Sequence, residues 1–208
     1  NITGDNNICI GVKSGALNAS GYDNVYIGTS AGYAGHGQYN VYIGESCGKT
    51  NAGGSLNTFM GKGAGTNNTT GSYNSIIGIE AGYNNGTGTE NVFMGASAGR
   101  MAVNTSENSF FGAFAGYNSA GNSNVMIGNS AGFNAPGSRN VFIGANAGYM
   151  ETGSDKLSIE NGIAALPLIA GDFQAQMVGI NRKPTTDTLE VGGTIWANGS
   201  TITAGLTT

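Results

Sequence analysis

Residues 24–33, Asn-Val-Tyr-Ile-Gly-Thr-Ser-Ala-Gly-Tyr, decide the fold, because close copies of this segment recur along the chain. The leading residue, which we call the anchor asparagine, occurs nine times at successive spacings of 17, 16, 17, 17, 17, 17, 16 and 16 residues. The anchors are Asn7, Asn24, Asn40, Asn57, Asn74, Asn91, Asn108, Asn124 and Asn140. This period is shorter than the roughly 33–50 residues of helical repeats or propeller blades, and it fits one coil of a β-solenoid.

Two glycines keep fixed positions in all nine copies. Four residues after the anchors stand Gly11, Gly28, Gly44, Gly61, Gly78, Gly95, Gly112, Gly128 and Gly144. Eight residues after the anchors stand Gly15, Gly32, Gly48, Gly65, Gly82, Gly99, Gly116, Gly132 and Gly148. Glycine adopts the positive φ of tight corners, and the β-branched and aromatic residues between the corners favour a strand. The sequence therefore predicts that residues 1–149 form a parallel β-solenoid shaft of about nine coils.

The composition agrees with an all-β chain. Glycine makes up 38 of 208 residues, and each glycine inside a helix costs about 1 kcal/mol relative to alanine, which excludes a helix bundle. Collagen is excluded because glycine does not recur at every third residue and only three prolines occur. The net charge of −4 gives no basic surface, so we do not expect nucleic acid among the partners. No apolar run approaches the roughly 18 residues of a membrane span, so we expect no membrane insertion.

The anchor asparagines are expected to have a structural role. Stacked parallel coils lie about 4.8 Å apart, so equivalent residues of successive coils come next to each other. A column of asparagines allows side-chain amides to hydrogen-bond from coil to coil. We therefore interpret the anchors and their glycines as the framework of the repeat.

The predicted strands have two apolar faces, since side chains alternate along a strand. The first and third residues after the anchor, such as Val25 and Ile27, point one way, and the second residue points the other. Small alanines such as Ala31 suit a narrow interior, so we expect the aromatic residues to face outward. The aromatic set is Tyr26, Tyr42, Phe59, Phe93, Phe110 and Phe142. Such a stripe is larger than a soluble monomer usually exposes, which predicts packing between chains in a homotrimer, although two-fold closure would bury the same residues.

The repeat resembles that of bacteriophage tail fibres and, more distantly, the head repeats of trimeric autotransporter adhesins. The matching units occupy residues 24–33, 40–49, 91–100, 124–133 and 140–149. Both families are trimers of interlocked β-rolls. The resemblance therefore implies that the coils are intertwined as a homotrimeric fibre.

After Tyr149 the anchors stop, and nine of the 20 charged residues fall within the last 59 residues. We therefore predict a second module at residues 150–208, a short C-terminal β-rich connector or tip. Its apolar segments resemble the strands that, in phage fibre proteins, precede a C-terminal intramolecular chaperone. These segments are residues 155–159, 167–173, 178–181 and 189–195.

Residues suited to catalysis or metal binding are few. His36 is the one histidine in the sequence, and it lies between two glycines. Glu90 and Glu107 occupy equivalent positions of adjacent coils, about 5 Å apart if the coils stack, a spacing found in retaining glycosidases and shared cation sites. Neighbouring coils supply no further acid at this position, so solvated glutamates are the better interpretation. We expect no enzymatic activity, no cofactor and no metal.

Two kinds of surface are candidates for binding. The residue after the second repeat glycine is aromatic in three consecutive coils, as Tyr117, Phe133 and Tyr149, and stacked rings there form a possible platform for glycans. Packing along an inter-chain seam is the alternative for these rings. Variable polar corners, such as residues 67–73, are loops on a rigid scaffold, where binding commonly occurs.

These observations favour a structural fibre protein of a phage tail, located in the virion, that presents or forms a receptor-binding surface for host attachment. Its expected partners are other tail or fibre proteins and a host cell-surface glycan or protein receptor. A bacterial trimeric adhesin at the cell surface is the alternative. A polysaccharide-degrading tailspike ranks below both because acids such as Glu45 and Glu80 are scattered, and ice binding ranks last because no outward threonine array exists.

Overall fold

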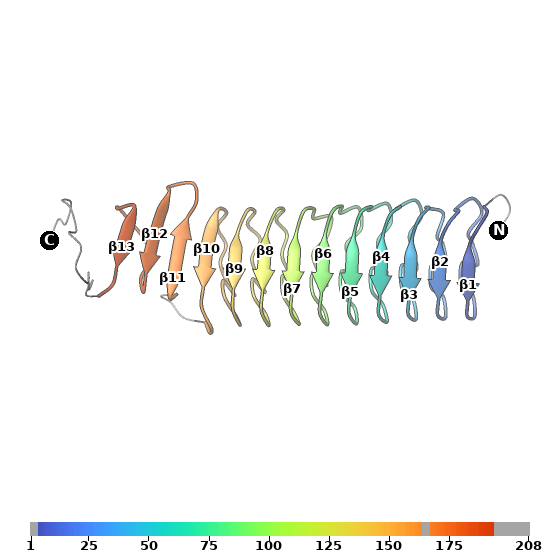
Figure 1. Cartoon of the computed structure of the whole chain (residues 1–208), viewed down its shortest axis with the longest axis horizontal. Helices are drawn as coiled ribbons and strands as arrows, with labels where there is room; N and C mark the ends of the chain where they lie inside the picture. Colours follow the sequence, from blue (N-terminus) through green and yellow to red (C-terminus); the bar gives the residue numbers. More distant parts are fainter. Residues whose placement is uncertain (1–3, 164–166, 194–208) are drawn as a thin grey trace, which may run out of the picture.

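The structure, a computed structural model, describes residues 4–163 and 167–193, and these contain strands and turns but no helix. Thirteen strands form one sheet whose spatial order follows the sequence (Figure 1). The first nine strands are β1 (Ile8–Ile10), β2 (Val25–Ile27), β3 (Val41–Ile43), β4 (Thr58–Met60), β5 (Ser75–Ile77), β6 (Val92–Met94), β7 (Ser109–Phe111), β8 (Val125–Ile127) and β9 (Val141–Ile143). The last four are β10 (Lys156–Ile159), β11 (Ile169–Asp172), β12 (Met177–Ile180) and β13 (Leu189–Val191).

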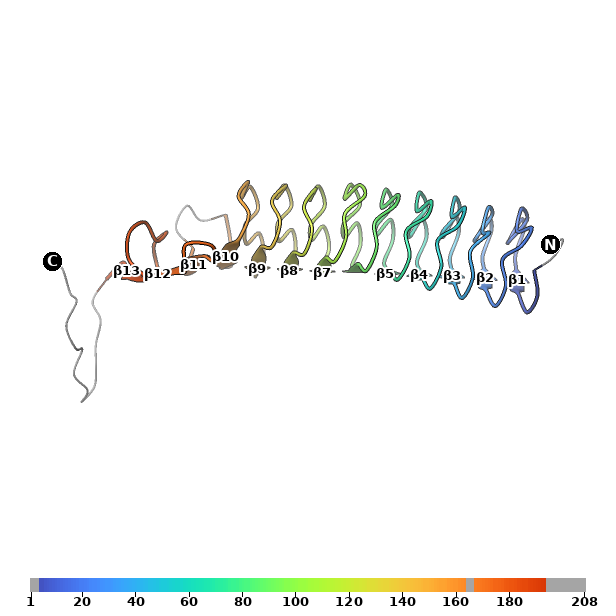
Figure 2. The same cartoon turned by 90° about the horizontal axis from the view of Figure 1, so that it is seen from above.

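Each repeat contributes one three-residue strand, which pairs in parallel with the equivalent strands of the repeats before and after it. In β2 and β3, for example, Tyr26 lies directly beside Tyr42. The same register holds throughout β1 to β9. Figure 2 shows the successive coils side by side along the rod, with the strands along one side. The predicted parallel β-solenoid of about nine coils is therefore confirmed.

The aromatic residues of the strands lie inside the coils. The middle residues of β2 to β9 have no exposed surface, and these are Tyr26, Tyr42, Phe59, Ile76, Phe93, Phe110, Met126 and Phe142. Together with alanines such as Ala31 and Ala64 they form one continuous core. Their rings stack from coil to coil, as Tyr42 and Phe59 do with centroids 4.8 Å apart.

This arrangement corrects the prediction that the aromatic residues pack between chains. The six residues assigned to that role were Tyr26, Tyr42, Phe59, Phe93, Phe110 and Phe142, and each is fully covered by its own chain. A three-residue strand has only one inward position, and an alanine alone leaves the coil interior unfilled. The large ring therefore occupies the inward position, and the first and third residues of the strand face outward.

The anchor asparagines form a buried, hydrogen-bonded ladder. The backbone N–H and side-chain Nδ2 of Asn57 donate to Oδ1 of Asn40, at 3.0 and 3.2 Å. The same Nδ2 also donates to the carbonyl oxygen of Gly71, at 2.9 Å. The bond from an anchor's backbone N–H to the preceding anchor's Oδ1 recurs at Asn24, Asn40, Asn57, Asn74, Asn91, Asn108, Asn124 and Asn140. Buried amides require such partners, so the ladder holds the coils in register.

The two repeat glycines are required by two different close approaches. Gly44 has a φ of +138°, and a Cβ atom there would lie 2.5 Å from the carbonyl oxygen of Gly61 in the next coil. Gly48 has a φ of +54°, and its Cβ would lie 2.5 Å from the ring of Tyr42. A side chain at the first position would separate adjacent coils, and one at the second would displace a core ring.

The parallel ladder extends beyond the last anchor. β10 pairs in parallel with β9, and Lys156, which takes the place of the next anchor, donates its backbone N–H to Oδ1 of Asn140 at 2.8 Å. The boundary predicted between residues 149 and 150 therefore lies within the ladder, which ends at β10. β11 and β12 then add antiparallel to the sheet, and β13 pairs in parallel with β12.

Strands occur in all four C-terminal segments where short strands were expected. β10, β11, β12 and β13 each overlap one of the predicted segments. Thr194 and Ile195, which were expected to extend the last strand, lie outside the described residues.

The loop between β12 and β13 is organised around one carboxylate. Oε1 of Glu190 accepts hydrogen bonds from the backbone N–H groups of Thr185, Thr186 and Asp187, and Oε2 forms an ion pair with Arg182 at 2.7 Å. Hydrogen bonds from the backbone, that of Thr186 foremost, lower the pKa of Glu190 to about 2. The ionised carboxylate therefore holds this loop together.

We expect Gly44→Ala to lower the free energy of unfolding by about 2–4 kcal/mol, because it combines a disfavoured backbone conformation with a clash between coils. Thermal and denaturant unfolding followed by circular dichroism measure the effect. Gly53→Ala is the matched control, since the nearest atom to its Cβ would be 4.0 Å away. Equal stability of the two variants would contradict the close approach of the coils.

The β12–β13 loop is expected to open in acid. Because the folded pKa of Glu190 lies below its ordinary value of 4.5, its contribution to stability is complete above about pH 4.5 and disappears as the pH falls toward 2. Hydrogen exchange of the Thr186 amide should accelerate over this range, beyond the intrinsic effect of pH. In the Glu190→Gln variant, the Thr186 amide should exchange rapidly over the whole pH range. Slow exchange of this amide in the variant would show that the carboxylate does not order the loop.

Candidate functional site

The structure brings the three predicted glycan-contact residues together. The rings of Tyr117 and Phe133 stack with centroids 4.8 Å apart and planes inclined by 3°, and those of Phe133 and Tyr149 stack at 5.0 Å and 8°. All three side chains are partly exposed. They form an aromatic ladder whose spacing follows the repeat of the coils.

The middle ring of the ladder offers its edge and not its faces. Nearly parallel rings about 5 Å apart cover each other's faces, so both faces of Phe133 are occupied by its neighbours. Phe114 adds a fourth ring, tilted by 49° against Tyr117. A sugar that stacks on a flat aromatic face therefore cannot use Phe133, which leaves only its ring edge for contact.

Arg100 extends the ladder toward the N-terminus, and the sequence analysis did not single it out. Its Nε donates to Oε2 of Glu80 at 2.7 Å, and its Nη1 donates to the Tyr117 hydroxyl at 3.2 Å. The guanidinium carbon also lies 5.4 Å from the ring centroid of Tyr83, a cation–π contact. Arg100 occupies the same repeat position as the aromatic residues, and this shared position is the signal that identifies it.

A pocket of about 350 Å³ lies at the C-terminal end of the parallel ladder. Phe142 and Tyr149 line it together with charged residues, among them Lys156 and Glu160. Oε1 of Glu160 accepts a hydrogen bond from Ser158 at 3.0 Å, and within the described residues its buried Oε2 has no hydrogen-bond partner. The pocket arises because Ser158 takes the inward position that an aromatic or aliphatic side chain fills in β2 to β9.

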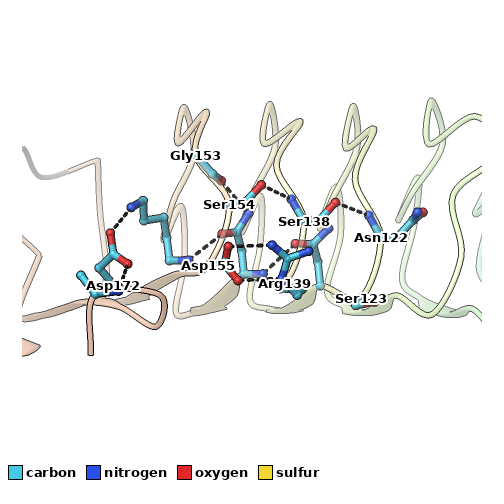
Figure 3. Close-up of polar contacts among 12 residues, drawn as sticks. Asn122, Ser123, Ser138, Arg139, Gly153, Ser154, Asp155 and Asp172 are labelled. Atoms are coloured by element: carbon cyan, nitrogen blue, oxygen red, sulfur yellow. Dashed lines mark hydrogen bonds and ion pairs between the residues drawn. The ribbon is translucent and has the colours of Figure 1, made fainter. Parts of the chain in front are cut away.

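Polar contacts join the last coils to the strands that follow (Figure 3). Arg139 donates two hydrogen bonds to the carboxylate of Asp155, both at 2.7 Å, and Lys156 pairs with Asp172 on β11. The hydrogen bond from Arg139 lowers the pKa of Asp155, and that from Lys156 lowers the pKa of Asp172. Backbone N–H groups also donate to hydroxyls of the next coil, as Ser138 does to Ser154 at 3.0 Å. These contacts connect β10 and β11 to the solenoid.

His36 and Glu107, two of the residues considered for chemistry, have structural partners. Nδ1 of His36 accepts a hydrogen bond from the Ala19 backbone N–H at 3.3 Å. Oε2 of Glu107 accepts one from Ser123 in the next coil, at 2.8 Å. Among the residues that the structure describes, no three His, Cys, Asp or Glu side chains lie close enough together to hold a metal ion.

A serine motif in the repeat, which the sequence analysis missed, has a backbone explanation. Four coils contain Gly-x-Ser-x-Gly directly after a strand, a pattern that marks the nucleophile of α/β-hydrolases when a helix follows and a histidine is adjacent. These serines are Ser30, Ser46, Ser97 and Ser130. Each has a φ of 55–57°, and Lys13, Glu80, Phe114 and Asn146 adopt similar values at the same corner of other coils. The motif therefore follows from the corner geometry of the coil.

Three comparisons with known proteins, against protein-family models, curated proteins and solved structures, find no match. In the described part of the chain no helix has the length and apolar character needed to cross a membrane.

The aromatic ladder is expected to stabilise the solenoid. Phe133→Ala removes a ring stacked on both sides and should lower the free energy of unfolding by about 1–3 kcal/mol. Phe114→Ala serves as the control, because that ring is tilted and 40% exposed. Its removal should lower the free energy of unfolding by less than that of Phe133. Denaturant unfolding compares the two variants, and a larger loss for Phe114→Ala would contradict the stacked arrangement.

Proposed function

We propose that the chain is a structural segment of a phage tail fibre that presents or forms a receptor-binding surface for host attachment. The observation that supports it best is the uninterrupted parallel ladder from β1 to β10, which builds an elongated rod from short coils. Nine coil-to-coil steps of about 4.8 Å give the ladder a length of about 43 Å. A rod of this kind holds an attached binding region at a distance from the particle.

The interior of the rod suits a protein that is pulled along its axis. Buried asparagines bond each coil to the next, and core rings stack along the same direction. Because every coil repeats the same contacts, the coils resist separation at each step along the rod. In the proposed fibre three copies of the chain associate, and other tail or fibre proteins join its ends.

Receptor contact is proposed at the polar corners and at the edges of the aromatic ladder, with a glycan or protein of the host surface as the ligand. Corner residues such as Thr69 and Thr87 are exposed, while the strands that carry the corners are fixed by the ladder. Variable loops on a rigid frame are suited to recognition.

The tailspike alternative has less support. Glu45 is ion-paired with Lys62 at 3.0 Å, and Glu80 is ion-paired with Arg100 at 2.7 Å. These acids are therefore engaged with basic neighbours and are not paired with each other, as the carboxylates of a glycosidase are.

Antibodies against the purified chain test the proposal by electron microscopy. We expect labelling of tail fibres on phage particles, and we expect the purified chain to reduce phage adsorption when cells are incubated with it first. Labelling of the bacterial envelope without phage would instead assign the chain to a surface adhesin. Release of reducing ends from host polysaccharide by the purified chain would assign it to a tailspike.

A further inference from the structure

The outward residues of β1 to β9 form an apolar stripe along one side of the rod. The first and third residues of these strands face away from the core and are partly or fully exposed. The first residues form one column of Ile8, Val25, Val41, Thr58, Ser75, Val92, Ser109, Val125 and Val141. The third residues form a second column of Ile10, Ile27, Ile43, Met60, Ile77, Met94, Phe111, Ile127 and Ile143. We call these two columns the outer stripe.

The outer stripe has the composition of an interface. None of its residues is charged, and its second column is apolar at every strand. Met60, Met94 and Phe111 each leave 38–39% of their surface exposed even though neighbours in the column flank them. Charged residues such as Glu107 and Arg139 stand directly before the anchor asparagines, outside the stripe. A continuous exposed apolar surface of this kind marks a site of association.

We propose that the outer stripe is the surface through which three copies of this chain associate, parallel and in register, about an axis along the rod. This inference rests on the fibre function proposed above and replaces the core aromatics as the site of chain association. It assigns the contact to the outward face of the sheet.

The repeat spacing of the stripe favours another copy as its partner. Apolar side chains recur in both columns at the spacing of the coils, about 4.8 Å. A second chain with the same coil spacing meets this pattern at every strand, whereas a partner without the repeat matches it over only a few strands. Copies aligned in parallel therefore bury the stripe along its whole length.

The size of the stripe is adequate for a stable contact. Nine strands with two outward residues each give eighteen residues, spread over about 40 Å. Specific interfaces use about 20–30 residues on each side, and the eighteen residues that each chain shares between its two neighbours approach that number once flanking residues are added.

Side-chain volumes along the stripe favour an in-register arrangement. The largest residue of the second column, Phe111, shares its strand with Ser109, and Met60 shares its strand with Thr58. Around a three-fold axis, the first column of one chain faces the second column of the next, at the same height if the chains are in register. Large residues then meet small ones, while the Val and Ile strands pair residues of intermediate size.

The first experiment compares masses in solution by light scattering. We expect the wild-type chain to have three times the 20.9 kDa mass of one copy. The double variant Ile77→Lys and Ile127→Lys should have the mass of a single copy, because buried ammonium groups in the stripe disfavour association. Val103→Lys is the matched control, an exposed apolar residue outside the stripe, and it should keep the threefold mass. Circular dichroism verifies that each variant retains its strands.

A second experiment tests register by disulfide cross-linking. Chains with Ser109→Cys and chains with Phe111→Cys, both in a Cys9→Ser background, are refolded together and oxidised. We expect cross-links between the two kinds of chain. A mixture of Ser109→Cys and Ile27→Cys chains should give few cross-links, because β7 and β2 lie at different positions along the rod.

Three results would overturn the inference. They are a wild-type chain that stays at 20.9 kDa at micromolar concentration, a lysine double variant that keeps the threefold mass, and preferential linkage of position 109 to position 27. A single-copy chain that binds lipid vesicles through the same residues would show that the stripe covers a membrane surface instead. If the stripe mediates trimer formation but the antibody labels cell envelopes, this inference stands and the phage assignment fails.

Discussion

The short distance between stacked coils is the constraint on which the rest of the structure depends. Backbone hydrogen bonds between parallel strands hold neighbours at about 4.8 Å, so every atom of one coil must fit against its equivalent in the next. Gly44 leaves room for the close approach of Gly61 in the next coil, and Asn57 bonds to Asn40 in the coil before it. The period of the sequence is the consequence, because each coil must present the same small and polar groups at the same places.

The interior and the exterior of the rod follow from this spacing together with the brevity of the strands. A three-residue strand has one inward and two outward positions. Rings such as Tyr42 and Phe59 then stack inside the coil, and residues such as Ile43 and Met60 are left outside. The same repetition that produces a continuous core therefore also produces a continuous apolar surface, which is why a protein that is stable as a stack of coils still has a face suited to association.

The repeat allowed the solenoid, its parallel register and its asparagine ladder to be predicted from spacing alone. The inward position of Tyr26 was not predictable in this way, because alternation says that two faces exist and does not say which one is enclosed. A strand was predicted at residues 155–159, but its parallel pairing with β9 as a tenth step of the ladder was missed. Lys156 has no anchor side chain, and only its backbone N–H continues the ladder. Arg100 and the pocket beside Ser158 depend on contacts between coils that a search for identical residues does not reveal.

X-ray diffraction from aligned rods of the purified chain tests the stacking of coils most directly. If the strands lie across the rod, as in the structure, a reflection at about 4.8 Å should appear along the rod axis, on the meridian. A 4.8 Å reflection on the equator would mean that the strands run along the rod, and it would contradict the stacked solenoid.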